Sequence, residues 1–377
     1  MNELRRKIEQ EIRECGPIPF SRYMEMCLYN PEFGYYSSHT AQFGKAGDFY
    51  TSSDVHAVFG RLLARQFEEM WRVLGSPPCI VVRELGPGRG LFAQDVMDWS
   101  EKKFPDFHSV LQYELVEQSA PLRRQIEQTL SGRLDSGKAQ LLSPRKEVAR
   151  KTVPTIVFAN EFFDAMPVEV LTADGSLRVN LQERGFGESW VAPSAEEMEF
   201  LDHYSIHPDS GERVEAGLRS QSEMMSACDI SRGFILIVDY GYSRDEQLAG
   251  RHRGTVKAVR KHSVSASPYE APGDQDITAD VNFTALAAIA QQNGMDVQQL
   301  VTQSQFLMGI GEANQFADAF EDCRLPQERA KVALQLKHLV TPAGMGESFH
   351  ILLASKGVDR ERVASLAGLN FGRRNSR

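Results

Sequence analysis

The chain has 377 residues, 42% of them hydrophobic, which is enough to bury a full core in one elaborated domain or two ordinary ones. Its 42 Lys and Arg residues against 51 Asp and Glu residues give a net charge of −9, which argues against a broad nucleic-acid footprint. Five scattered cysteines without a C-x-x-C pair argue against a disulfide framework, and no apolar run approaches the roughly 20 residues that cross a bilayer.

The N-terminal region is expected to be helical. Apolar residues recur every four positions between Leu4 and Ile12, which predicts a first helix, and similar patterns predict a second helix over 21–29 and a long third one capped by Asp54. Residues 32–53 are rich in Gly, aromatic and hydroxyl side chains without a steady period, which indicates a structured loop. The charged N-terminus offers no apolar stretch for a signal peptide, so we expect a soluble, cytoplasmic protein.

From residue 79 the pattern changes to short apolar runs that alternate with helical segments. The predicted strands are 79–85, 111–117, 138–142, 155–160, 234–240 and 347–355, and helices are predicted at 91–103 and 120–130. Strands separated by helices indicate βαβ units, so the fold class is α/β with a mostly parallel sheet.

Two insertions interrupt this alternation. The first is expected to hold a hairpin over 176–192 and a helix near 212–228, and the second to hold helices near 282–293 and 312–339. The alternation of strands and helices defines a core of 79–170, 231–254 and 295–356. The insertions 171–230 and 255–294 are expected to form the substrate region, to which the N-terminal segment 1–78 contributes. Residues 357–377 form a tail.

A glycine-rich turn follows the strand at 79–85. It reads Glu84-Leu85-Gly86-Pro87-Gly88-Arg89-Gly90 and opens a helix, so backbone N–H groups there can face a ligand. The dinucleotide fingerprint would need its third glycine one position later. The pattern E-x-G-x-G-x-G instead resembles that of class I methyltransferases, and its acid suits a cationic ligand better than a pyrophosphate. Gly86, Gly88 and Gly90 are therefore expected to bind S-adenosylmethionine.

The next strand ends at Glu117, where a carboxylate can accept hydrogen bonds from both hydroxyls of a ribose. The alternative is a glycine-rich turn without any ligand, with Glu117 as a surface acid at a strand end. The presence of acids at both Glu84 and Glu117 favours the cofactor site.

A further acidic group lies at the carboxyl end of the fourth strand, in Asn160-Glu161-Phe162-Phe163-Asp164. Ligands of open α/β sheets bind beyond such ends, and a helical turn would place Glu161 and Asp164 on one face. Two carboxylates suit a guanidinium, which keeps its charge and needs acids to hold it and take its proton. Asn160 or Asp164 could alternatively be a helix cap. His203 and His207 lack a third ligand, so no metal site is expected.

Six segments together resemble the MidA family of methyltransferases, whose mitochondrial members assist assembly of respiratory complex I by methylating an arginine of a core subunit. They are PIPFSRYMEMCLYNPEFGYYSS, FGKAGDFYTSSDVHAVFGRLLA, VRELGPGRGLFAQDVM, ANEFFDAMPVEVL, VDYGY and PGDQDITADVNFTAL, and they cover roughly residues 15–355. The resemblance implies a Rossmann-like class I fold with a seven-stranded sheet and S-adenosylmethionine as cofactor.

Carried over to this chain, the resemblance implies cofactor contacts at Glu84, Gly86, Gly88, Glu117 and Asn160, a loop at Gly47, Asp48, Phe49 and Thr51 that folds over the cofactor, and catalytic acids at Glu161 and Asp164. One departure is Thr51-Ser52-Ser53-Asp54, where the family has T-S-P-E. This departure bears on the choice of acceptor more than on the chemistry. Tyr35 and Tyr36 could stack on a guanidinium, or belong to the core.

The leading functional hypothesis is methyl transfer to a protein side chain, most readily an arginine of a complex I type subunit. A small-molecule methyltransferase and an assembly factor with a vestigial cofactor site are the alternatives, and nicotinamide chemistry is a distant fourth. The expected partners are a protein substrate and no nucleic acid, with no membrane span, and a homodimer stays open.

Overall fold

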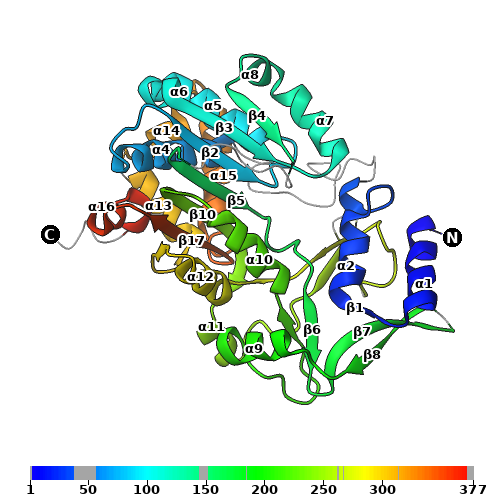
Figure 1. Cartoon of the computed structure of the whole chain (residues 1–377). Coiled ribbons are helices and arrows are strands. Elements are labelled where there is room, and N and C mark those ends of the chain that lie inside the picture. The colour runs from blue at the N-terminus through cyan, green and yellow to red at the C-terminus, as the bar shows by residue number, and fades with distance from the viewer. Residues whose placement is uncertain are drawn as a thin grey trace.

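The computed structural model describes residues 2–37, 57–143, 152–183, 185–260, 263–265, 267–312 and 314–371. Within them, a large α/β core lies beside a smaller mixed region that carries the N-terminus (Figure 1). The predicted loop over 32–53 is described only to residue 37, and Asp54 lies outside the described residues.

The core is built on one twisted sheet whose continuous strand order is β15-β17-β10-β5-β2-β3-β4. Its strands are β2 (Ile80–Leu85), β3 (Leu111–Val116), β4 (Ala139–Leu142), β5 (Thr155–Asn160), β10 (Gly233–Tyr242), β15 (Asp296–Val297) and β17 (Phe349–Lys356), with short β14 (Val281–Asn282) beside β10 and β16 (Val301–Thr302) beside β17. Strands β4, β3, β2, β5 and β10 are parallel, whereas β17 is antiparallel to β10. The predicted mostly parallel sheet of seven strands is confirmed, and β14 and β16 are additional short strands.

The direction in which strands are added reverses between β2 and β5. From β2 the chain adds β3 and β4 on one side, and then returns to add β5, β10 and β17 on the other. Ligands of open α/β sheets bind beyond the carboxyl ends of the strands at such a switch point. The topology therefore predicts a ligand site beyond the carboxyl ends of β2 and β5.

Helices cover both faces of this sheet, because the central strands are apolar on both sides. Ile156 and Phe158 of β5 point into one core with α4, α5 and α13, whereas Val157 and Ala159 point into the other with α10 and α12. The bounds of these helices are α4 (Ala57–Val73), α5 (Leu91–Lys103), α10 (Leu218–Ala227), α12 (Phe283–Gln292) and α13 (Gln303–Glu312).

The smaller region combines β-sheet and two N-terminal helices around its own hydrophobic core. It consists of α1 (Glu3–Cys15), α2 (Phe20–Tyr29), η1 (Tyr35–Ser37), the sheet of β1 (Ile18–Pro19), β6 (Glu169–Thr172), β7 (Gly175–Gln182), β8 (Gly185–Val191) and β9 (Val214–Ala216), and the sheet of β11 (Lys257–Arg260), β12 (Ser263–Val264) and β13 (Asp276–Thr278). The predicted hairpin is present as β7 and β8, which pair from Ser176–Val191 to Gln182–Gly185.

Two helix predictions need correction. The helix expected over 312–339 is interrupted, because Gln315 and Phe316 adopt positive φ and Pro326 starts a new helix at its first turn. The helix near 212–228 begins only at Leu218, since the preceding residues pair as β9 with β6. The remaining helices are α6 (Pro105–Val110), α7 (Ala120–Thr129), α8 (Ser131–Asp135), α9 (Ala195–Tyr204), α11 (Arg244–Leu248), α14 (Ala317–Phe320), α15 (Pro326–Val340), α16 (Arg360–Ala364) and η2 (Ala367–Leu369). None of the helices in the described part of the chain has the length and apolar character needed to cross a membrane.

Candidate functional site

A cavity of about 350 Å³ lies beyond the carboxyl ends of β2, β3, β5 and β10. Its wall includes residues of the smaller region, from α2, η1 and β13, and residues of α10. This volume is within the range of small-molecule and cofactor pockets. The cavity therefore lies at the switch point and joins the core to the smaller region.

The glycine turn forms one wall of the cavity. Gly86 and Gly88 line it with φ of 63° and 55°, a left-handed backbone that favours glycine. A Cβ at Gly88 would meet no atom of the described residues within 4 Å, whereas one at Gly86 would lie 2.7 Å from the Phe162 ring. The position of Gly88 is thus open space on the cavity wall.

Gly90 has a different place from the one expected for a cofactor contact. It is the N-cap of α5 with φ of 77°, and its N–H donates to the Pro87 carbonyl at 2.9 Å. A Cβ there would be 3.3–3.5 Å from Leu130 and Ile126, so the position faces packed side chains. Gly90 is not among the residues that line the cavity; it shapes the turn and lets α7 pack closely.

Glu84 is the penultimate residue of β2, lies on the cavity wall and is 4% exposed. The Tyr113 hydroxyl donates to its Oε2 at 2.9 Å. Burial raises the pKa of Glu84 to about 8, against the opposing effect of that hydrogen bond. A ligand cation would favour the ionised form, so the environment of Glu84 suits an ammonium or sulfonium group.

Glu117 lies directly after β3 and is also buried on the cavity wall. The Ser119 N–H donates to its Oε1 at 2.7 Å, which fixes the carboxylate beside the glycine turn. Burial raises the pKa of Glu117 to about 7, although hydrogen bonds from backbone N–H groups and the charge of Arg123 oppose this. The two acids predicted for cofactor binding thus line the same cavity.

The turn after β5 contains a strained residue. Glu161 has φ of 48°, a left-handed conformation that costs a non-glycine residue on the order of 1–3 kcal/mol. Its N–H donates to the Val238 carbonyl at 2.9 Å, and the Asn160 Nδ2 donates to its Oε1 at 3.1 Å. The buried Oδ1 of Asn160 has no hydrogen-bond partner among the described residues. Asn160 and Glu161 both line the cavity.

Asp239, which sequence reasoning missed as a site residue, holds this turn in place. It is fully buried in β10, and its Oδ2 accepts the N–H groups of Phe162, Phe163 and Asp164 at 3.2, 2.9 and 3.3 Å. Burial and the neighbouring Asp164 carboxylate raise the pKa of Asp239 well above its ordinary value. The available signal was an acid that interrupts the apolar run FILIVDY.

Asp164 is 4% exposed and lies on the cavity wall with Glu161. Burial raises its pKa to about 6, opposed by hydrogen bonds from the Tyr240 hydroxyl and the Ala165 N–H. The two acids share this cavity, but the turn that carries them is not helical, since three of its N–H groups bind Asp239 instead. The expected helical turn and the alternative of a helix cap are therefore both wrong.

Tyrosines and a third acid complete the wall opposite the core. The Tyr29 hydroxyl donates to the Ala165 carbonyl at 2.9 Å, and the Tyr36 hydroxyl donates to Asp276 Oδ1 at 3.2 Å. The two rings are 5.5 Å apart. Tyr35 also lines the cavity, but Tyr29 and Asp276 had not been expected there, since each lies in a segment without a recognisable ligand-binding pattern.

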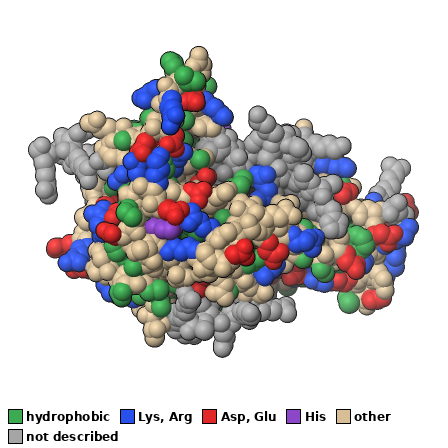
Figure 2. Space-filling view, turned by 90° about the horizontal axis from the view of Figure 1, so that it is seen from above, with side chains coloured by type: hydrophobic (Ala, Val, Ile, Leu, Met, Phe, Trp, Pro, Cys, Tyr) green, Lys and Arg blue, Asp and Glu red, His purple; other side chains and the backbone are tan. Residues whose placement is uncertain are grey.

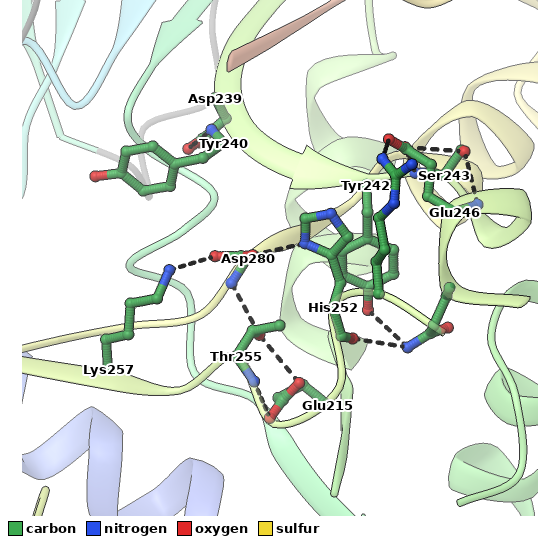
Figure 3. A network of polar contacts seen from close by, with 12 residues as sticks. Glu215, Asp239, Tyr240, Tyr242, Ser243, Glu246, His252, Thr255, Lys257 and Asp280 are labelled. Atoms are coloured by element: carbon green, nitrogen blue, oxygen red, sulfur yellow. Dashed lines mark hydrogen bonds and ion pairs between the residues drawn. The ribbon is translucent and has the colours of Figure 1, made fainter. Parts of the chain in front are cut away.

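A polar network supports the segment that follows β13 (Figure 3). Asp280 accepts from Lys257 Nζ at 3.2 Å and lies 2.9 Å from His252 Nδ1, while its N–H donates to the Thr255 hydroxyl. That hydroxyl donates in turn to the buried Glu215 of β9. The Tyr240 ring points away from this network in Figure 3. The network thus stabilises the backbone beside the cavity rather than the cavity wall itself.

Negative charge gathers inside the cavity. Among the described residues that line it, seven are acidic and three are arginines; Arg83 pairs with Glu114, and Arg219 pairs with Glu223. On the face shown in Figure 2, acidic and basic side chains are interspersed among the residues coloured by type. The donor set and the unpaired Asn160 Oδ1 fit a ligand with cationic groups and hydroxyls.

The predicted cofactor contacts at Gly47, Asp48, Phe49 and Thr51 lie outside the described residues, as does the departure at Ser53-Asp54. Their roles stay predictions.

Comparisons with known proteins agree with this geometry. A family model of S-adenosyl-L-methionine-dependent methyltransferases matches residues 62–301. The mitochondrial protein arginine methyltransferase NDUFAF7 homolog of Drosophila melanogaster is 30% identical, over 94% of this chain and 85% of that protein. The human NDUFAF7 is 27% identical, over 92% of this chain and 81% of that protein.

Two solved structures from Burkholderia thailandensis are also similar along nearly the whole chain. One holds S-adenosyl-homocysteine, has a TM-score of 0.82 at 27% identity and covers 97% of this chain and 94% of its own. The other, in native form, has a TM-score of 0.80 at 26% identity and covers 98% and 94%. The chain therefore belongs to the MidA family of class I, S-adenosylmethionine-dependent methyltransferases.

Proposed function

We propose that this methyltransferase acts on a protein side chain and that the acceptor is an arginine nitrogen. The observation that carries the proposal is the pair Glu161 and Asp164, the first half-buried and the second buried, which line the cofactor cavity together. The relatives named as protein arginine methyltransferases support it. A core subunit of a complex I type enzyme is the first acceptor to test, because the resemblance to the MidA family implies such an acceptor.

The two ends of the cavity have separate tasks in this proposal. S-adenosylmethionine supplies the methyl group, and Glu84, Glu117 and the turn at Gly86 and Gly88 would hold it. Glu84 would pair with its ammonium, and Glu117 would accept from the ribose hydroxyls. Asn160, whose Oδ1 lacks a protein donor among the described residues, would accept a further ligand N–H or O–H.

The acids of the β5 turn act on the acceptor. Glu161 and Asp164 bind the guanidinium N–H groups, which aligns one nitrogen for an in-line attack on the methyl carbon. As the N–C bond forms and the C–S bond breaks, the nitrogen becomes more acidic, and one of the two carboxylates takes its proton. A pKa of about 6 leaves Asp164 largely ionised at neutral pH, as a proton acceptor must be.

The test is a transfer assay with methyl-labelled S-adenosylmethionine and a lysate of the source organism, followed by acid hydrolysis of the labelled protein. The expected product is labelled methylarginine. Gly88→Val, which should not bind the cofactor, serves as the blank. Label in methyl-lysine, or only in small molecules, would overturn the proposal.

A further inference from the structure

The cavity holds a third carboxylate at its acceptor end that the mechanism above leaves without a task. Asp276 belongs to β13, in the segment PGDQDIT, and is 6% exposed. It lines the cavity with Glu161 and Asp164, although more than 110 residues of sequence separate it from them. A buried acid on a cavity wall is costly unless charge or hydrogen bonds compensate it.

Three hydrogen bonds connect the region of Asp276 with the β5 turn and with the cofactor end of the cavity. The Ala279 N–H donates to the Asp164 carbonyl at 2.9 Å, which ties the end of β13 to that turn. The Tyr36 hydroxyl donates to Asp276 Oδ1, and the Tyr36 carbonyl accepts from the Ser119 hydroxyl at 2.6 Å beside Glu117. Tyr36 therefore spans the distance between the cofactor end of the cavity and Asp276.

The acids affect the pKa of three tyrosines of the cavity wall, Tyr29, Tyr36 and Tyr240. Burial raises the pKa of Tyr36 well above its ordinary value, and the charges of Asp276 and Asp164 raise it further. The pKa of Tyr29 and that of Tyr240 are raised in the same way, by burial and then by nearby carboxylates that include Asp164 and Asp276. All three tyrosines line the cavity, so a ligand between the acids would meet them.

We propose that Asp276 binds the guanidinium of the acceptor across the cavity from Asp164 and thereby selects arginine. This inference rests on the proposed function. A planar guanidinium has five N–H donors, enough for carboxylates on two sides, and it stacks on tyrosine rings in a way that a compact ammonium does not. Asp276 is a binding residue here, whereas Glu161 and Asp164 carry the proton transfer.

The test measures binding without turnover, by titration calorimetry with saturating S-adenosyl-homocysteine. The probes are acetyl-Gly-Arg-Gly-amide and the same peptide with citrulline, which has the shape of arginine without its charge. The wild-type chain should bind the arginine peptide at least about tenfold more tightly than the citrulline peptide, because the charged hydrogen bonds are lost with citrulline.

In Asp276→Asn the preference for the arginine peptide over the citrulline peptide should fall several-fold. The variant removes the carboxylate and citrulline removes the guanidinium charge, so both changes remove the same interaction. The asparagine Oδ1 can still accept from Tyr36, so the fold is expected to persist. Asp274→Asn, an exposed acid two residues away that does not line the cavity, is the matched control and should keep the wild-type preference. Affinity for S-adenosyl-homocysteine should not change in either variant.

Tyr36→Phe provides a second variant, which keeps the ring but removes the hydroxyl bound to Asp276 and should alter the preference several-fold. If the folded variants show the wild-type preference for arginine, Asp276 is not a selecting residue, although the proposed function stands. If the wild-type chain binds both peptides equally, the proposed function fails together with this inference.

Discussion

The two ends of the cavity are built in different ways. The cofactor end is local: Glu84, Gly86 and Gly88 belong to one βα turn, and Glu117 ends the neighbouring strand. The acceptor end is assembled from distant parts of the chain, the β5 turn, β10, α2, η1, α10 and β13. The difference implies that the acceptor can change through the insertions and the N-terminal segment while the cofactor end keeps its structure.

The largest expected effect is on the cofactor end. Gly88→Val places a branched side chain on the cavity wall in a left-handed backbone, so it should abolish cofactor binding that we expect to be micromolar, about −8 kcal/mol, in the wild type. Calorimetry with S-adenosylmethionine measures this. Gly250→Val is the control, because Gly250 also has positive φ and open space around it but lies outside the cavity. Equal binding by both variants would contradict a cofactor role for the turn.

Substitutions at the acceptor end should show the opposite behaviour: the methyl-transfer rate falls while cofactor binding is kept. Glu161→Gln and Asp164→Asn each remove a charged partner and a proton acceptor, so the methyl-transfer rate should fall about 10²–10⁴-fold. Cofactor affinity should stay within about twofold of wild type. Asp174→Asn, an exposed acid in the turn between β6 and β7, is the control. A parallel loss of cofactor affinity would assign the two acids to the cofactor end instead.

A smaller effect is expected from Glu117. Glu117→Ala removes an acceptor for the ribose hydroxyls, and hydrogen bonds to a charged group contribute about 1.5–3 kcal/mol, so the cofactor Kd should rise at least about tenfold. Glu127→Ala, on the exposed side of α7, is the matched control. An unchanged Kd in Glu117→Ala would make this residue a structural acid that only holds the Ser119 N–H.

The smallest effect is a pH dependence that differs between the two ends. The folded-state pKa values of Glu84 and Glu117, about 8 and about 7, and that of Asp164, about 6, lie above the ordinary values. The ligand-free folded chain therefore binds protons that the unfolded chain releases, and stability is lost as pH rises from about 5 to about 8.

Thermal unfolding of the ligand-free protein should show this as a Tm that falls by roughly 5 °C or more over that range. Glu84→Gln should reduce the slope up to about pH 8, and Asp164→Asn should reduce it up to about pH 6. A Tm that rises with pH in the wild type would contradict this, because it would show that the folded chain stabilises the ionised form of these carboxylates.

Sequence reasoning found the core of the fold because its strands are continuous apolar runs separated by amphipathic helices. It also found Glu84 and Glu117, since a local turn and a strand end are readable from spacing alone. It missed Tyr29 and Asp276, because their place depends on how the smaller region folds against the core. Long-range packing of that kind leaves no periodic signal.

Gly90 and Asp239 illustrate the same limit inside recognised motifs. The turn pattern does not distinguish a glycine that faces the ligand from one that faces Leu130 and Ile126. Asp239 lies in β10 near the same edge of the sheet as Glu84 and Glu117, but it binds backbone N–H groups and is not among the residues that line the cavity. Only the three-dimensional contacts separate an acid that builds a turn from an acid that meets a substrate.

The positive φ of Glu161 lowers the stability of the fold, and this cost bears on how the residue is retained in evolution. Glycine adopts a φ of 48° without the cost that a glutamate bears there, so the chain would gain stability by giving up this side chain. If Glu161 acts on the acceptor as proposed, selection for methyl transfer is what retains the glutamate. A relative with glycine at this position is expected to be more heat-resistant, to bind S-adenosylmethionine as well as before, and to have lost methyl transfer. A glycine at the position of Glu161 would thus identify, from sequence alone, family members that no longer transfer a methyl group.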